Sequence, residues 1–146
     1  MKIKKKSFFG GDEMTENRYK KGYYIVCIVF ILRILSMFLY LDGEGQVLID
    51  FGFYNTHVSD LGLSLCKCFI YTIAMYGLIN NFSWGLISTT LISFCISIVN
   101  LRDLIQYSDM IQYGDYTFVI NTILFLSVFA YLSSVISKKI KEIVED

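Results

Sequence analysis

Long apolar runs alternate with shorter polar segments along the chain, and four of the runs are long enough to cross a lipid bilayer. A helix that spans a hydrocarbon layer about 30 Å thick needs about 20 predominantly apolar residues. The runs lack the strict alternation of a membrane β-strand, and an isolated segment in lipid satisfies its backbone only as a helix. The pattern therefore predicts four transmembrane helices, over residues 23–41, 61–80, 84–100 and 117–137.

The lengths of the connecting segments indicate how these helices are arranged. Only Asn81, Phe82 and Ser83 separate the second run from the third, so these two should form an antiparallel hairpin. The segments 42–60 and 101–116 connect the remaining runs, and the second of them could either extend the third helix or lie flat on the membrane. We expect an all-α integral membrane protein whose four transmembrane helices form an antiparallel bundle.

Charged residues are segregated along the chain, although the formal net charge is zero. They make up 18% of the residues, against about a quarter in a typical soluble domain. The tails at 1–22 and 138–146 are rich in lysine, whereas the segment 42–60 contains four acidic residues and no base. Because basic residues are retained on the cytoplasmic side, we expect both termini in the cytoplasm and the membrane to be the plasma (inner) membrane. The neutral total gives no reason to expect binding to nucleic acid.

Residues that carry out catalysis or bind metals are scarce. The four cysteines form no Cys-x-x-Cys pair, and His57 is the only histidine, so neither a metal site nor a cofactor is expected. No nucleophile-elbow, zinc-protease or P-loop motif occurs. We therefore do not expect an enzyme, and a loop site that uses His57 and Asp60 is the one catalytic alternative left open.

Arg33 lies near the middle of the first predicted span, where a cation costs roughly 2.5–3.5 kcal/mol. Ser36 and Tyr40 follow at offsets of three and seven, so the three residues should share one helix face. Because no span contains an acidic residue, three partners for Arg33 remain open. They are an acid of the outer loops, Asn121 with backbone carbonyls and water inside the bundle, or an acid or anion from outside the chain. Together with Lys67 of the second span, these residues form a candidate intramembrane polar site.

Small residues recur every fourth position in the third span and predict a helix-packing face. This face consists of Gly85, Thr89, Ser93 and Ser97. Small side chains let helix backbones approach closely, which drives association in lipid. Similar series occur in the second span, at Ser64, Cys68 and Thr72, and in the fourth, at Ser127, Ala130, Ser134 and Ser137. We expect these faces to meet inside the bundle, or alternatively one of them to face another subunit.

The two outer loops combine aromatic and acidic residues. A near-repeat, Ile-Gln-Tyr-Ser-Asp at 105–109 and Ile-Gln-Tyr-Gly-Asp at 111–115, dominates the second loop. Exposed tyrosines beside acids suit a protein interface and equally suit anchoring at the membrane surface. The candidate outer-loop contact residues are His57, Asp60, Tyr107, Asp109, Tyr113 and Asp115.

These observations favour a non-enzymatic, small polytopic membrane protein that acts through protein–protein contact. It could be an accessory subunit, or an immunity-type protein that blocks a pore-forming toxin. The alternative is a homo-oligomeric channel or transporter with an anion path near Arg33 and Lys67. The expected partners are the lipid bilayer and either another membrane protein or further copies of this chain.

Overall fold

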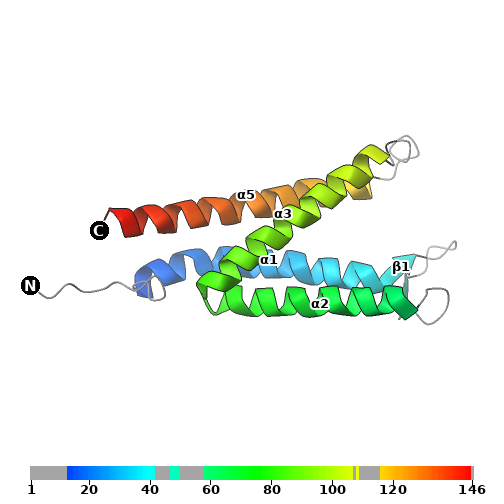
Figure 1. Cartoon of the computed structure of the whole chain (residues 1–146), viewed down its shortest axis with the longest axis horizontal. Helices are drawn as coiled ribbons and strands as arrows, with labels where there is room; N and C mark the ends of the chain where they lie inside the picture. Colours follow the sequence, from blue (N-terminus) through cyan, green and yellow to red (C-terminus); the bar gives the residue numbers. More distant parts are fainter. Residues whose placement is uncertain (1–12, 42–46, 50–57, 107, 109–115, 146) are drawn as a thin grey trace, which may run out of the picture.

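The computed structural model describes residues 13–41, 47–49, 58–106, 108 and 116–145 of the chain. Within these residues the chain forms four long helices and one short β-hairpin (Figure 1). In chain order the elements are α1 (Glu13–Phe38), β1 (Leu39–Leu41), β2 (Val47–Ile49), α2 (Val58–Ile79), α3 (Ser83–Gln106) and α5 (Thr117–Val144). The predicted helical architecture is therefore observed.

All four helices extend beyond the predicted spans, and α2 does so only by three residues at its start, Val58. α1 begins at Glu13, well before the predicted start at Tyr23, and α5 continues to Val144. α3 continues to Gln106, so residues 101–106 extend the third helix. The apolar pattern marks only the part of a helix that matches the hydrocarbon layer. Lysine and glutamate are good helix formers, so a helix can continue where the apolar run stops.

The end of the first predicted span is extended rather than helical. Leu39–Leu41 forms β1, which pairs antiparallel with β2 in the register Leu39↔Ile49, Tyr40↔Leu48 and Leu41↔Val47. The prediction that the first helix continues to Leu41 is therefore wrong. Alternating large aliphatic and aromatic residues have high strand propensity, and this pairing satisfies backbone groups where the helix ends.

α3 is the central helix of the bundle. Figure 1 shows α1 and α2 side by side and antiparallel, with α3 crossing from the end of α2 to α5. The start of α1, the α2–α3 connection and the end of α5 lie at one end of the molecule, which we call the terminal end. The β-hairpin lies at the opposite end. Because consecutive helices run in opposite directions, α5 ends at the same end of the molecule at which α1 begins.

A cluster of aromatic rings joins α1 to two of its neighbours. Phe30 of α1 is fully buried, and its ring meets Tyr71 of α2 edge-on at 5.5 Å between centroids. The same ring meets Phe125 of α5 at 5.7 Å with an interplanar angle of 78°. Edge-to-face pairs at these separations add to the stabilisation from burial. Phe30 is therefore the main anchor of α1 in the bundle.

The outer surface of the bundle is apolar. Of the described helices, three are long and apolar enough to cross a membrane: Gly62–Ile79 of α2, Ser83–Gln106 of α3 and Val119–Val144 of α5. Only 28% of the α2 and α5 spans is buried inside the bundle, against 44% of α3. Side chains such as Phe69, Ile73 and Leu91 are exposed. So large an apolar surface is stable only against lipid or another apolar partner, which indicates a helical membrane protein.

The α2–α3 connection is a tight turn built on Asn81. The Asn81 N–H donates to the Leu78 carbonyl at 3.0 Å and the Phe82 N–H to the Gly77 carbonyl at 2.9 Å. This pair of bonds is the Schellman pattern that closes a helix, and it requires a left-handed residue at the first position after the helix. Asn81 takes that position with φ of 59°. Asparagine tolerates this conformation better than most residues, so the residue fits the turn.

The turn brings the backbones of α2 and α3 into direct contact at Gly77 and Gly85. A Cβ added at Gly77 would lie 2.8 Å from the Cα of Gly85, and one added at Gly85 would overlap the backbone of Gly77 and Leu78. A Cβ at Gly77 would also lie 2.6 Å from the ring of Trp84, but the backbone contacts at both glycines cannot be relieved by turning a side chain. Glycine at both positions is therefore required for this helix–helix distance.

We expect Gly85→Ala to destabilise the bundle by roughly 1–3 kcal/mol, because the added methyl group must push the two backbones apart. The measurement is unfolding in mixed micelles by sodium dodecyl sulfate, followed by the fluorescence of Trp84, the single tryptophan. Gly62→Ala is the matched control, since a Cβ there meets no atom within 4 Å and both variants gain helix propensity. Equal unfolding midpoints for the two variants would contradict the contact.

Candidate functional site within the helix bundle

Arg33 is half-buried on α1, five residues before the helix ends at Phe38. Its Nε atom is buried and makes no hydrogen bond. Ser36, the next residue of the predicted polar face, donates its hydroxyl to the backbone carbonyl of Arg33 at 2.7 Å. The hydroxyl proton is therefore directed at the helix backbone and not at the guanidinium group.

The remaining members of the predicted polar site are not gathered around Arg33. Tyr40 lies in β1, where it pairs with Leu48, so the helical offset that placed it on the Arg33 face does not apply. Lys67 is exposed on α2, and Asn121 is half-buried on α5. Among the described side chains, no hydrogen bond or ion pair joins Arg33 to Lys67 or Asn121.

Tyr71 is a neighbour of Arg33 that sequence reasoning missed. It is 8% exposed and packs against Phe30, which lies one helical turn before Arg33 on α1. The sequence contains no signal for this position. Arg33 lies in the last third of α1 and Tyr71 near the middle of α2, and the sequence does not specify which faces of the two helices meet.

The small residues of α3 are all buried. Thr89 and Ser93 are fully buried, Ser97 is 2% exposed, and Gly85 lies against Gly77 of α2. Each hydroxyl donates to the carbonyl four residues earlier in α3, at 2.6–2.8 Å. The single proton of the Thr89 hydroxyl is shared with the Ala74 carbonyl oxygen at 3.3 Å, which makes this the weaker branch of a three-centre hydrogen bond that reaches between helices. The face thus packs inside the chain, with its polar groups satisfied by backbone.

The corresponding series of α2 and α5 do not meet this face. Thr72 is exposed, and Ser64 and Cys68 are only half-buried. Ser127, Ala130, Ser134 and Ser137 are exposed on α5. Larger residues of α5 are buried instead, namely Phe125, Val128, Leu132 and Val135. The prediction that the three small-residue faces meet is wrong for α2 and α5, because hydroxyls bonded to their own helix backbone need no protein neighbour.

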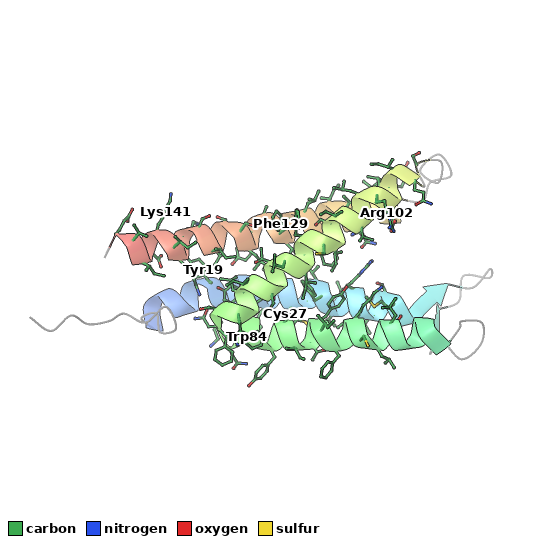
Figure 2. All side chains as sticks on the ribbon, viewed as in Figure 1. Tyr19, Cys27, Trp84, Arg102, Phe129 and Lys141 are labelled. Carbon is green, nitrogen blue, oxygen red and sulfur yellow. The ribbon has the colours of Figure 1, made fainter. Side chains whose placement is uncertain are left out.

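The predicted outer-loop contacts fall almost entirely on positions that the structure does not describe. His57, Tyr107, Asp109, Tyr113 and Asp115 lie outside the described residues. Asp60 lies in the first turn of α2, and its side chain is also outside the description. Nearby, Arg102 at the end of α3 pairs with Asp103 at 2.9 Å (Figure 2). In the described part of the chain, no group of three His, Cys, Asp or Glu residues could hold a metal ion.

Comparison with known proteins finds no protein-family model, no curated protein and no solved structure that matches the chain. Its function has therefore to be inferred from the residues and their arrangement.

We expect Thr89→Val to destabilise the bundle by about 0.5–1.5 kcal/mol, because valine keeps the shape but removes the hydrogen bond to Ala74. The midpoint of unfolding in mixed micelles is the readout. Thr72→Val is the matched control, since Thr72 makes the same local bond, to Cys68 at 2.8 Å, but is exposed. If both variants unfold at the same midpoint, the interhelical bond contributes nothing measurable.

Proposed function

We propose that this chain is a non-enzymatic membrane protein with four spans, which acts by contact with another protein in the plasma (inner) membrane. The proposal adds α1 to the three spans identified by length and composition. From Tyr23 to Phe38 the sequence contains a single charged residue, Arg33. Ile25, Ile28 and Leu32 on this stretch are exposed and would face lipid.

Both termini are assigned to the cytoplasm in this proposal. The start of α1 and the end of α5 share one end of the bundle, so their basic tails flank the same membrane surface (Figure 1). Lys20, Lys21, Lys138 and Lys141 are all exposed at this end. Lysine and arginine near the ends of membrane spans are enriched on the cytoplasmic side, which supports this orientation.

The guanidinium group of Arg33, whose Nε is buried without a hydrogen-bond partner among the described residues, carries the functional proposal. Between the first turns and the last turns of the described helices, the sequence contains no Asp or Glu that could neutralise it. A charge at this depth costs roughly 2.5–3.5 kcal/mol. A leucine would pack at this position at no such cost, so we infer that a carboxylate from a partner helix offsets the charge.

Two biological roles fit such a contact. An accessory subunit would use the pair to attach to a larger membrane protein. An immunity-type protein would use it to hold a pore-forming toxin in a closed state within the membrane. Both roles need a partner helix with an acid at mid-depth, and neither needs catalytic residues in this chain.

A homo-oligomeric channel with an anion path near Arg33 and Lys67 is the second candidate, and it has less support. Lys67 is exposed on α2, whereas Arg33 is half-buried on α1. Two cations that line one path should lie on a common surface. In liposomes that contain the purified chain, anion flux that falls in Arg33→Gln would favour this candidate over the contact proposal.

We expect Arg33→Leu to weaken partner binding by more than about tenfold, because the buried carboxylate of the partner would lose its counter-charge. The measurement is native mass spectrometry of the tagged chain, extracted gently from its own host. Arg33→Lys should retain part of the binding. Arg102→Leu is the control, since Arg102 pairs with Asp103 of its own helix.

A stoichiometric partner that is lost only with Arg33→Leu supports the proposal, provided that the partner carries a mid-membrane acid. Charge exchange then gives the sharpest test, in which Arg33→Glu is combined with replacement of that acid by lysine or arginine. Restored binding in the exchanged pair identifies the contact. A wild-type chain that is monomeric and free of partners, with Arg33→Leu behaving like wild type in the cell, would contradict the proposal.

A further inference from the structure

Three aromatic rings form a row at the α2–α3 connection. The ring of Tyr76, in the last turn of α2, lies 6.5 Å from the ring of Phe82 between centroids. Phe82 stacks on Trp84, the second residue of α3, with 5.9 Å between centroids and an interplanar angle of 18°. Figure 2 shows Trp84 at the terminal end of the bundle. We call Tyr76, Phe82 and Trp84 the aromatic cluster.

The bundle holds this cluster in a defined position. The Trp84 ring lies directly on α2, because a Cβ added at Gly77 would be 2.6 Å from two of its ring atoms. Phe82 belongs to the tight turn, where its N–H donates to the Gly77 carbonyl at 2.9 Å. Asn81 of the same turn accepts a hydrogen bond from Lys139 of α5 at 3.0 Å. The position of the cluster in a membrane is therefore coupled to that of three helices.

The bundle leaves much of the cluster uncovered. Tyr76 is 62% exposed, Phe82 42% and Trp84 44%. Rings that serve only to pack the helices are buried, as Phe30 and Phe125 are. Exposed apolar surface that is gathered in one place marks a contact with lipid or with another molecule. The cluster therefore needs a neighbour from outside the chain.

The cluster lies at the boundary of the apolar part of the bundle. Phe82 stands between the two candidate membrane spans Gly62–Ile79 and Ser83–Gln106. Tyr76 and Trp84 lie within one helical turn of the ends of these spans. Where two spans are joined by so short a connection, the connection lies at the surface of the hydrocarbon layer. The three rings are thus placed where the acyl chains of a bilayer meet the head groups.

The cluster also continues an exposed apolar stripe of α2. Phe69, Ile73 and Tyr76 recur at spacings of four and three, which places them on one face, and all three are exposed. The stripe and the cluster therefore form one continuous surface. Lipid that covers the stripe also reaches the cluster, which favours lipid over a soluble protein as the neighbour.

Tyrosine and tryptophan suit the interfacial layer of a bilayer. Each combines a large apolar ring with one polar donor, namely the phenol hydroxyl of Tyr76 and the indole N–H of Trp84. In this layer the ring contacts the acyl chains, and the donor can bond to ester and phosphate oxygens of the lipid. Phe82 lies between them and contributes apolar area alone.

We propose that the aromatic cluster binds the interfacial layer of the lipid bilayer and fixes the depth of the α2–α3 hairpin in the membrane. Because Asn81 is bonded to Lys139, the same anchor also sets the depth of the end of α5. The proposal requires that α2 and α3 cross a bilayer. It does not depend on the protein partner of Arg33 or on the side of the membrane at which the termini lie.

The first test uses Trp84, the single tryptophan, as a probe of its own depth. The full-length chain is placed in phosphatidylcholine vesicles that carry bromine atoms either next to the ester groups or near the ends of the acyl chains. We expect the bromines next to the ester groups to quench Trp84 at least about twice as strongly as the deep ones. Stronger quenching by the deep bromines, or quenching by water-soluble acrylamide alone, would overturn the proposal.

Dilution of the chain in lipid distinguishes a lipid neighbour from a second copy of the chain. Quenching by the bromines next to the ester groups should not change with the ratio of protein to lipid. If this quenching rises as the chain is diluted, other copies cover the cluster at high density, and the assignment to lipid is wrong.

Variants in bilayers of different thickness test whether the cluster fixes the depth. When the acyl chains are lengthened, wild-type Trp84 should keep its quenching pattern, because anchored residues resist leaving the interface. In Tyr76→Ala and Phe82→Ala, we expect the ratio of shallow to deep quenching to change by about twofold. Phe69→Ala is the matched control, since Phe69 is 69% exposed on α2 but lies outside the cluster.

Unfolding in mixed micelles separates lipid contact from helix packing. Tyr76→Ala and Phe69→Ala both remove an exposed ring from α2, so they should unfold at the same midpoint. If Tyr76→Ala unfolds earlier than Phe69→Ala while Trp84 keeps its wild-type pattern in thick bilayers, the ring has a packing role and the proposal is wrong. Cluster variants that match Phe69→Ala in every bilayer would contradict it as well.

Discussion

The close approach of α2 and α3 at Gly77 and Gly85 determines where the other helices can lie. Helices in lipid gain little from hiding apolar surface, so their association depends on close packing and on hydrogen bonds between them. The two glycines provide the packing, and Thr89 provides a hydrogen bond to Ala74 one helical turn further along α3. With one end of α3 held against α2, its far half is free to diverge from α2 and to pack against α5 (Figure 1). α1 then occupies the remaining position through Phe30.

Two places in this bundle carry polar groups that the fold itself does not need. Arg33 brings a charge to mid-depth, where its Nε has no partner, and Tyr19 and Tyr23 bring buried hydroxyls to the terminal end. An apolar side chain of similar size would pack at each position with less desolvation cost. In the proposed function, the guanidinium group of Arg33 is met by an acid of the partner that lies within the membrane.

The main features of the fold could be predicted because a bilayer restricts the length and the composition of the helices that cross it. The three-residue connection at Asn81 required an antiparallel hairpin, and the spacing of Gly85, Thr89, Ser93 and Ser97 identified the buried face of α3. The end of the first helix could not be predicted in the same way, because the three apolar residues Leu39–Leu41 are compatible with a helix and with a strand. The position of Tyr71 beside Phe30, and the contact of Lys139 with the rings of Tyr19 and Tyr23, were also missed. Each joins residues from helices whose facing sides the sequence does not specify.

The sequence by itself determined that most of the helix surface is apolar, that the charged residues other than Arg33 and Lys67 lie outside the apolar stretches, and that α2 and α3 are antiparallel neighbours. Only the tertiary structure decided which side of each helix lies inside. Ser127 and Ser134 share one face of α5, as Ser93 and Ser97 share one face of α3, yet they face outward while the larger Phe125 and Leu132 are buried. In water, burial sorts polar from apolar residues and so reveals the inner face. In lipid, a serine bonded to its own helix and a leucine are both tolerated on the outside, so complementarity of shape between helices makes the choice.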